Sequence, residues 1–214
     1  MPTPLRLGVL ISGSGRTLQN FMDLSDAGRL KARVVKVVSS RPDAYGLERA
    51  RQHGVPAATV SRRDFDSIDE FSDAITAELQ AEGVELVAMA GFLSLYRFPP
   101  AYADRVINIH PALLPSFGGK GFYGDRVHQA VLDCGCKVSG CTVHFASNQY
   151  DKGPIIVQKT VPVLEDDDAH TLADRVFAAE TETYPEAINL YAEGRLRIEG
   201  RKVHVTAGNG SERQ

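Results

Sequence analysis

The alternation of short apolar runs with segments of helical period constrains the fold of this chain more than any other feature. The runs lie at residues 7–11, 34–38, 57–60, 86–90 and 106–109, and the helical segments at residues 16–27 and 43–53 and from Ile68 to about Gly83. Continuous apolar runs separated by helices are typical of a parallel sheet covered on both faces, because its strands are buried on both sides. The sequence therefore predicts an α/β fold with a doubly wound, mostly parallel sheet.

The second half of the chain is less regular. Residues 111–124 contain two prolines and four glycines, which predicts a long ordered loop. A helix is expected to begin near His170, with Asp167 or Asp168 as its cap, and Pro185 should kink or interrupt it. Further elements are expected as strands at 141–145 and 154–161, a helix face at Val127, Ala130, Val131 and Cys134, and a hairpin at 196–199 and 202–205. No repeat or linker divides the chain, so we expect a single domain over residues 1–206 and a polar, disordered tail at 207–214.

Composition narrows the functional class. The 214 residues include 24 Lys and Arg against 27 Asp and Glu, and a net charge of −3 supplies no general attraction for nucleic acid or an acidic membrane. No apolar stretch is long enough to span a bilayer, and the start lacks the layout of a signal peptide. Three cysteines in a secreted protein would leave one unpaired, which favours a reducing cytoplasm. We therefore expect a cytoplasmic protein with small-molecule partners.

A Gly-Ser-Gly turn follows the first apolar run. In the segment from Ser12 to Leu18, backbone N–H groups at a helix start can hold a phosphate, and Arg16 and Thr17 can add donors. An ordinary tight turn is the alternative. A dinucleotide fingerprint does not fit, because Leu18 stands where its third glycine belongs and no acid ends the second run. Arg41 stands at the end of the second run and could accept the 2′-phosphate of NADP, so the sequence argues less strongly against NADP than against NAD. A site for a single phosphate group is favoured.

Two polar side chains lie at the end of the fifth run. Alternation along a strand places Asn108 and His110 on one face, at the carboxyl end where open α/β sheets bind ligands. The amide can stabilise an oxyanion, and the imidazole can exchange a proton near neutrality. A loop-anchoring Asn108 and a structural His110 explain the same residues equally well.

Two acids complete the set of candidate site residues. Asp151 precedes a Gly-Pro turn that can direct it back toward a cleft, and beside His110 it would raise the pKa of the imidazole and fix its orientation. A plain turn aspartate is the commoner case. Glu180 lies within the apolar arc of the last helix, where it either binds a ligand amine or hydroxyl or sits at the wet edge of the arc.

A metal site is not predicted. Cys134, Cys136 and Cys141, with His144, match no zinc spacing, and small buried thiols are the favoured interpretation. We expect His128 and His170 on helix surfaces or ends, in structural roles, and the acidic residues 166–168 as a helix cap rather than a calcium loop.

Six segments, in their order and spacing, resemble the glycinamide ribonucleotide formyltransferases, a family of folate-dependent enzymes, over about residues 7–205. They are Leu10-Ile-Ser-Gly-Ser-Gly, Tyr45-Gly-Leu-Glu-Arg-Ala-Arg, Ala90-Gly-Phe, Ile107-Asn-Ile-His-Pro with Leu113-Leu-Pro, Gly140-Cys-Thr-Val-His-Phe and Asp151-Lys-Gly-Pro-Ile-Ile.

The resemblance implies a Rossmann-like formyltransferase fold and transfer of the formyl group of 10-formyltetrahydrofolate, a co-substrate, to the amine of glycinamide ribonucleotide in purine biosynthesis, without a metal. Residues 1–110 would form the phosphate- and nucleotide-binding half, and residues 111–206 the folate-binding and catalytic half. Asn108 and His110 would stabilise the tetrahedral intermediate, while Asp151 would keep His110 protonated and assist proton shuttling. A homodimer is plausible from the family. The implied ribonucleotide contacts are Gly15, Arg16, Thr17 and Glu180, and the implied folate contacts are Leu93, Ser94, Leu95, Tyr96, Asn108, Ser147, Asn148, Gln149, Tyr150 and Asp151.

The chain departs from the family pattern at several positions. Ile68 aligns with a folate-contacting Arg of some members, for which Arg62 or Arg63 is a candidate substitute, and Phe177 stands where some members have Gln. The loop at 116–124 is longer than in the shortest members, and Lys120 within it is a candidate phosphate contact.

Four other functions compete. A formyltetrahydrofolate hydrolase is expected to carry an additional N-terminal domain, and a methionyl-tRNA formyltransferase an additional tRNA-binding domain with basic surplus. A sugar-nucleotide formyltransferase shares the Asn–His–Asp chemistry but fits the phosphate loop and the last helix less well. A non-catalytic phosphate- or folate-binding module has no need of Asn108, His110 and Asp151 together.

Overall fold

The computed structural model describes residues 3–207 and divides into two compact units. The N-terminal unit extends to residue 109 and includes residues 146–150, and the C-terminal unit contains residues 110–145 and the chain from 151 onward. Of the polar tail expected at 207–214, residues 208–214 lie outside the described residues.

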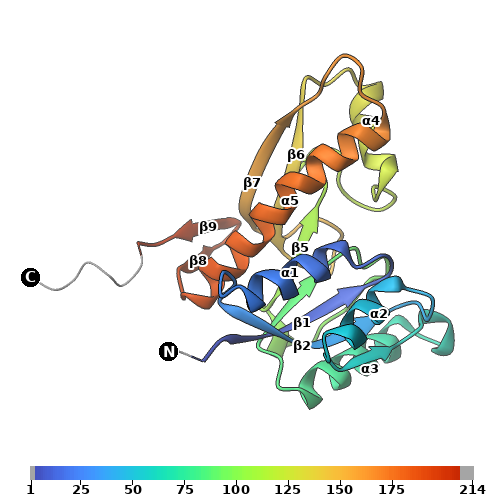
Figure 1. The fold of residues 1–214 in the computed structure, drawn as a ribbon, viewed down its shortest axis with the longest axis vertical. Helices are drawn as coiled ribbons and strands as arrows, with labels where there is room; N and C mark the ends of the chain where they lie inside the picture. The colour runs from blue at the N-terminus through green and yellow to red at the C-terminus, as the bar shows by residue number, and fades with distance from the viewer. Residues whose placement is uncertain (1–2, 208–214) are drawn as a thin grey trace, which may run out of the picture. The chain divides into compact units, whose positions relative to one another are not determined.

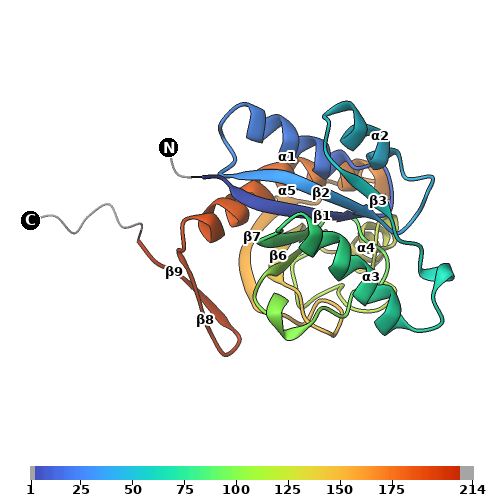
Figure 2. The ribbon, with the colours of Figure 1, turned by 90° about the horizontal axis from the view of Figure 1, so that it is seen from below.

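The N-terminal unit is a five-stranded parallel sheet between helices (Figure 1). Its strand order is β3-β2-β1-β4-β5, with helices α1 and α2 on one face and α3 on the other, as Figure 2 shows. The predicted doubly wound, mostly parallel sheet is therefore confirmed. The elements are β1 (Leu5–Ile11), α1 (Arg16–Asp26), β2 (Ala32–Ser39), α2 (Tyr45–Gln52), β3 (Ala57–Thr59), a 3₁₀ turn η1 (Arg62–Asp64), α3 (Ile68–Ala81), β4 (Leu86–Met89), a 3₁₀ turn η2 (Pro100–Tyr102) and β5 (Val106–His110).

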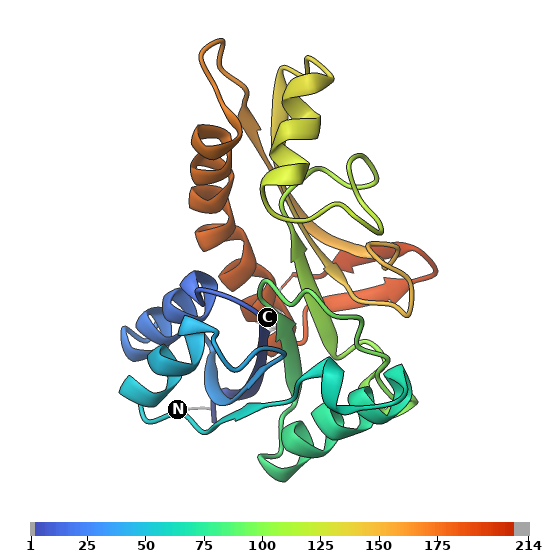
Figure 3. The ribbon, with the colours of Figure 1, turned by 90° about the vertical axis from the view of Figure 1, so that its right-hand side faces the viewer.

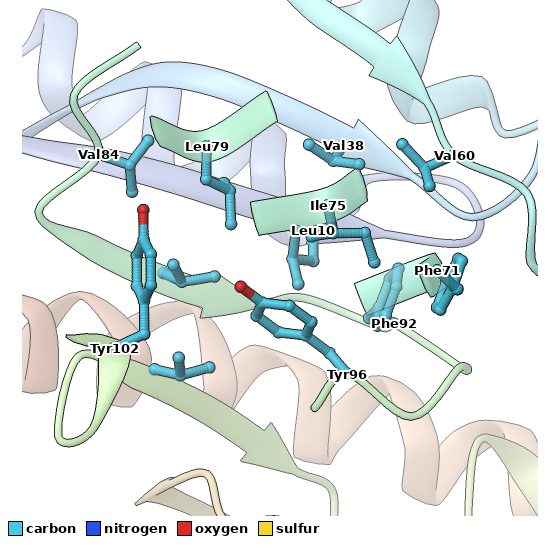
Figure 4. Close-up of a cluster of buried hydrophobic side chains, with 12 residues drawn as sticks. Leu10, Val38, Val60, Phe71, Ile75, Leu79, Val84, Phe92, Tyr96 and Tyr102 are labelled. Carbon is cyan, nitrogen blue, oxygen red and sulfur yellow. The ribbon is translucent and has the colours of Figure 1, made fainter. Parts of the chain in front are cut away.

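One cluster of apolar side chains fills the space between this sheet and α3 (Figure 4). Phe71, Ile75 and Leu79 recur at the helical spacing that the sequence predicts for this face, and all three are buried. Tyr96 enters the cluster from the connection after β4, and its hydroxyl lies 2.9 Å from Thr76 Oγ1. Burial raises the pKa of Tyr96 to about 12, so this phenol stays neutral in the core.

The C-terminal unit combines an antiparallel strand pair with a long helix. Strands β6 and β7 pair antiparallel, the hairpin of β8 and β9 adds through β9, and α5 packs against β6 and β7 (Figure 3). Residues 111–124 form the predicted loop between β5 and α4. The elements are α4 (Asp125–Asp133), β6 (Val138–Phe145), β7 (Ile155–Pro162), α5 (Ala169–Ala192), β8 (Leu196–Glu199) and β9 (Lys202–Val205).

Two expectations for this unit are wrong, those for Cys134 and His128. At Pro185, where a kink or an interruption was expected, α5 is not interrupted, because Pro185 and its neighbours Tyr184 and Ala187 are buried, and this packing offsets the missing hydrogen bond. Cys134 is exposed, because it is the C-cap of α4 and lies beyond Val131, the last buried residue of that helix. His128 is buried rather than on the helix surface, since it lies beside Val127 on the inner side of α4.

None of the helices within residues 3–207 combines the length and apolar character needed to cross a bilayer.

Asp168 should stabilise α5 measurably. Its carboxylate accepts the Thr171 N–H at 2.8 Å, and Thr171 Oγ1 accepts the Asp168 N–H at 2.9 Å, which makes a reciprocal cap. We expect Asp168→Ala to lower the free energy of unfolding by about 1 kcal/mol in urea denaturation. Asp166→Ala removes an exposed acid two residues away and should have little effect. Equal losses in the two variants would contradict the capping role.

Candidate active site

His110 ends β5 and is buried, with its side chain 4% exposed. Its Nε2 lies 2.8 Å from the carbonyl oxygen of Phe117, which can only accept, so Nε2 carries the hydrogen. Phe117 has a φ of 52°, a left-handed conformation that is rare for a bulky residue. The loop therefore holds a strained backbone at the point where its carbonyl orients the imidazole.

Asp151 lies between two imidazoles. Its Oδ2 is 3.6 Å from His110 Nδ1, and its Oδ1 is 3.6 Å from His144 Nε2. The Gly119 N–H donates to Oδ2 at 2.8 Å. Asp151 itself has a φ of 54°, in the left-handed region that aspartate tolerates better than most residues. The turn thus directs the carboxylate inward, and the structure brings Asp151 and His110 together.

The loop from 111 to 124 is fastened to the strand that carries His144. Thr142 Oγ1 on β6 donates to Ala112 O at 2.6 Å and accepts the Leu114 N–H at 3.0 Å. Gly118 lies between Leu114 and Asp151, since a Cβ on this glycine would clash with Leu114 Cδ2 and would lie 3.4 Å from Asp151 Cβ. Strand β6 and the loop therefore position the carboxylate together.

Burial and nearby charge shift the pKa of His110 in opposite directions. Burial lowers the pKa of His110 below its ordinary 6.5 and outweighs the charge of Asp151 and the Phe117 carbonyl, which raise it. Asp151 thus has the expected direction of effect on the pKa of His110, and desolvation, which residue spacing does not reveal, opposes it.

Asp151 remains ionised. Burial raises the pKa of its carboxyl, but the nearby His144 imidazole, the charge of His110 and the Gly119 N–H together lower it below its ordinary value. Both nitrogens of His110 face acceptors, so a proton that reaches Nδ1 is stabilised by the carboxylate. The arrangement is suited to a general acid–base pair in which His110 gains a proton during the reaction.

The contact between His144 and Asp151 is not predicted from the sequence, which offers His144 only as a possible metal ligand together with the cysteines. Its Nδ1 lies 2.8 Å from the Phe145 carbonyl, which leaves Nε2 directed at Asp151. The usable signal was the hairpin, because β6 and β7 pair His144 with Ile155, four residues after Asp151. A second histidine, His128, also lies near His110. Burial is the main cause that lowers the pKa of His128, and the charge of His110 lowers it further.

The remaining predicted residues lie on both units. Asn108 is half-buried on β5, two residues before His110. Glu180 is half-buried on α5, and its charge adds to burial in raising the pKa of the Cys141 thiol to about 11. In the N-terminal unit, Gly15 caps α1 with a φ of 69°, and Arg16 and Thr17 begin the helix.

The segments expected to line a folate pocket differ in exposure. Leu93 is 55% exposed and Ser94 and Leu95 are half-buried, but the Tyr96 side chain belongs to the core. Asn148, Gln149 and Tyr150 are exposed, and Ser147 is half-buried and donates through Oγ to Gln149 O at 2.9 Å.

The structure also shows the surroundings of several positions at which the chain departs from the family pattern. Ile68 packs against the apolar cluster, and Arg62 donates to Phe65 O at 2.6 Å. Lys120 is exposed in the loop. Within residues 3–207, no group of three or more His, Cys, Asp or Glu side chains is arranged to hold a metal ion.

A doubly wound sheet in which a buried histidine ends one strand and lies near a buried carboxylate is typical of α/β enzymes. The formyl transferase family model matches residues 5–188, and the chain belongs to this family.

Comparison with individual proteins narrows the kind of formyl transferase that this chain resembles. A solved structure of glycinamide ribonucleotide transformylase 1 from Symbiobacterium toebii is 47% identical with a TM-score of 0.91, covering 97% of this chain and 96% of that one. Phosphoribosylglycinamide formyltransferase of Haemophilus influenzae is 36% identical over 94% of this chain and 93% of its own. The trifunctional purine biosynthetic protein adenosine-3 of Drosophila melanogaster is 39% identical over 90% of this chain, which spans only 14% of that protein. The predicted resemblance to glycinamide ribonucleotide formyltransferases is confirmed.

The electrostatics of His110 can be tested by NMR. We expect its ring protons to titrate below pH 6.5, and lower still in Asp151→Asn, because the carboxylate raises the pKa of His110. Because folding lowers the pKa of His110, its contribution to stability is present above pH 6.5 and is lost as the pH falls from 6.5 through the folded-state value. A midpoint for His110 that stays constant or rises in Asp151→Asn would contradict this account.

Proposed function

We propose that this enzyme transfers the formyl group of 10-formyltetrahydrofolate to the amine of glycinamide ribonucleotide. The observation that carries the proposal is the buried Asp151 carboxylate set against His110, in a chain that belongs to the formyl transferase family. Relatives with the phosphoribosylglycinamide formyltransferase name support purine biosynthesis as the setting. We extend the proposal, on the family resemblance alone, to a cytoplasmic location and a homodimer.

The chemistry needs a stabilised oxyanion and a proton path. The neutral amine attacks the formyl carbon, and the carbonyl oxygen gains negative charge as the tetrahedral intermediate forms. In our proposal Asn108 donates through its amide and His110 through its imidazolium, and both stabilise this charge. Collapse breaks the bond from carbon to folate N10, while a proton leaves the amine and one reaches N10. Asp151 supports His110 in its charged form and assists this proton transfer.

Apart from Asp151, which we also propose as a folate contact, the proposed substrate contacts lie outside the proton-transfer pair. We propose that the backbone N–H groups at Gly15, Arg16 and Thr17 bind the ribonucleotide phosphate at the start of α1, where the helix dipole favours an anion. Glu180 would accept from the amine or a ribose hydroxyl. The reduced folate would lie against residues 93–96 and 147–151, with the apolar surface of Leu93 available to its ring system.

His110→Ala tests the proposed mechanism. We expect kcat to fall by about 10²–10⁴-fold, the scale of a lost acid–base group. His170→Ala is the matched control, because it removes an exposed histidine, 83% exposed in its side chain, and should leave kcat unchanged. Asp151→Asn should reduce kcat similarly while circular dichroism shows an intact fold. Wild-type turnover in His110→Ala would exclude His110 as the proton donor.

A further inference from the structure

Most of the backbone acceptors in the loop that precedes α1, residues 12–15, are already occupied. An anion site needs N–H groups directed outward and carbonyl oxygens turned away, because a carbonyl dipole aimed at a phosphate repels it. Three carbonyls of this loop accept hydrogen bonds: Gly13 from Gly46 N at 3.1 Å, Ser14 from Arg49 Nε at 2.9 Å and Gly15 from Gln19 N at 2.9 Å. Just before the loop, Ile11 at the end of β1 accepts from Ser40 N at 3.0 Å.

Arg49 is the only side chain in this set of donors, and three contacts fix its guanidinium. Besides Ser14 O, Nη1 donates to Gln19 Oε1 at 3.1 Å, and the guanidinium carbon lies 5.0 Å from the centre of the Tyr45 ring. Within the described chain, residues 3–207, no carboxylate pairs with Arg49. Its positive charge is therefore held beside the loop without being neutralised.

The starts of α1 and α2 meet backbone to backbone, which brings Arg49 to this position. A Cβ on Gly15 would lie 2.6 Å from the Gly46 Cα, so neither helix can carry a side chain at the contact. Figure 2 shows the two helices side by side on one face of the sheet. Arg49 lies one helical turn after Gly46 and spans the gap from α2 to the loop.

We propose that Arg49 is a positioning residue for the phosphate of the ribonucleotide. It holds the Ser14 carbonyl away from the anion, which leaves the N–H groups at the start of α1 as the surface presented to it. Its charge adds to the affinity for a phosphate dianion. This inference rests on the proposed function, since it takes the loop before α1 as the phosphate site.

Arg49→Gln and Arg51→Gln form a matched pair for the test. Both remove one positive charge from α2, but Arg51 is exposed and pairs with Glu48 on its own helix. We expect Arg49→Gln to raise the KM for glycinamide ribonucleotide by about tenfold to a hundredfold, the scale of a lost charged hydrogen bond. Both kcat and the KM for the folate should stay within about twofold, and Arg51→Gln should match the wild type. Arg49→Lys, which keeps the charge without the planar fork, should fall between them.

Binding of inorganic phosphate, followed by NMR titration of the backbone amides, separates this inference from the proposed function. We expect phosphate to shift the Gly15–Thr17 amides, with a Kd that is weaker in Arg49→Gln than in Arg51→Gln. If the wild type transfers formyl groups but the two variants have equal phosphate Kd and equal KM, the inference is wrong and the function stands. If phosphate binding depends on Arg49 but no formyl transfer occurs, the function fails and the positioning role stands. A rise in the folate KM equal to that for the ribonucleotide would overturn the inference, because it would indicate a general loss of structure.

Discussion

The charge of Asp151 is the constraint on which the C-terminal unit depends. A carboxylate that is only 11% exposed must be surrounded by donors, because an uncompensated buried charge costs several kcal/mol. The Gly119 N–H in the loop between β5 and α4 donates to this carboxylate. The rings of His110 at the end of β5 and His144 on β6 each lie 3.6 Å from it and compensate its charge when they are protonated. The left-handed backbone at Phe117 and at Asp151 follows from the same requirement, because each turn brings a polar group to the cluster that an ordinary conformation would direct elsewhere.

In our proposal, the loop before α1 follows a related principle for an incoming anion. Around Asp151 the fold compensates the charge of a resident anion, whereas at the loop Arg49 and the backbone of α2 occupy carbonyl oxygens next to the N–H groups that we propose bind phosphate. At the loop before α1, the close approach of two backbones depends on glycine, at Gly15 against Gly46. In our proposal, phosphate recognition belongs to the N-terminal unit and proton transfer to the residues around Asp151.

Features that depend on the spacing of residues within one segment could be predicted from the sequence. The strands of the N-terminal unit, the face of α3 and the cap at Asp168 all follow from spacing that a single segment contains. His144 was missed because its approach to Asp151 depends on the register between β6 and β7, which local pattern does not specify. The net pKa shift of His110 was missed because desolvation depends on how completely the loop covers the ring. At Pro185, burial of the helix outweighed a propensity that is valid only for an isolated segment.

The most direct test of the account is to mix the purified enzyme with 10-formyltetrahydrofolate and follow tetrahydrofolate release with and without glycinamide ribonucleotide. We predict release only in the presence of the ribonucleotide, with one formylated product formed for each tetrahydrofolate. Release without the ribonucleotide would show that water is the acceptor and that the enzyme is a hydrolase. No release in either mixture would contradict the assignment of Asp151 and His110 to formyl transfer.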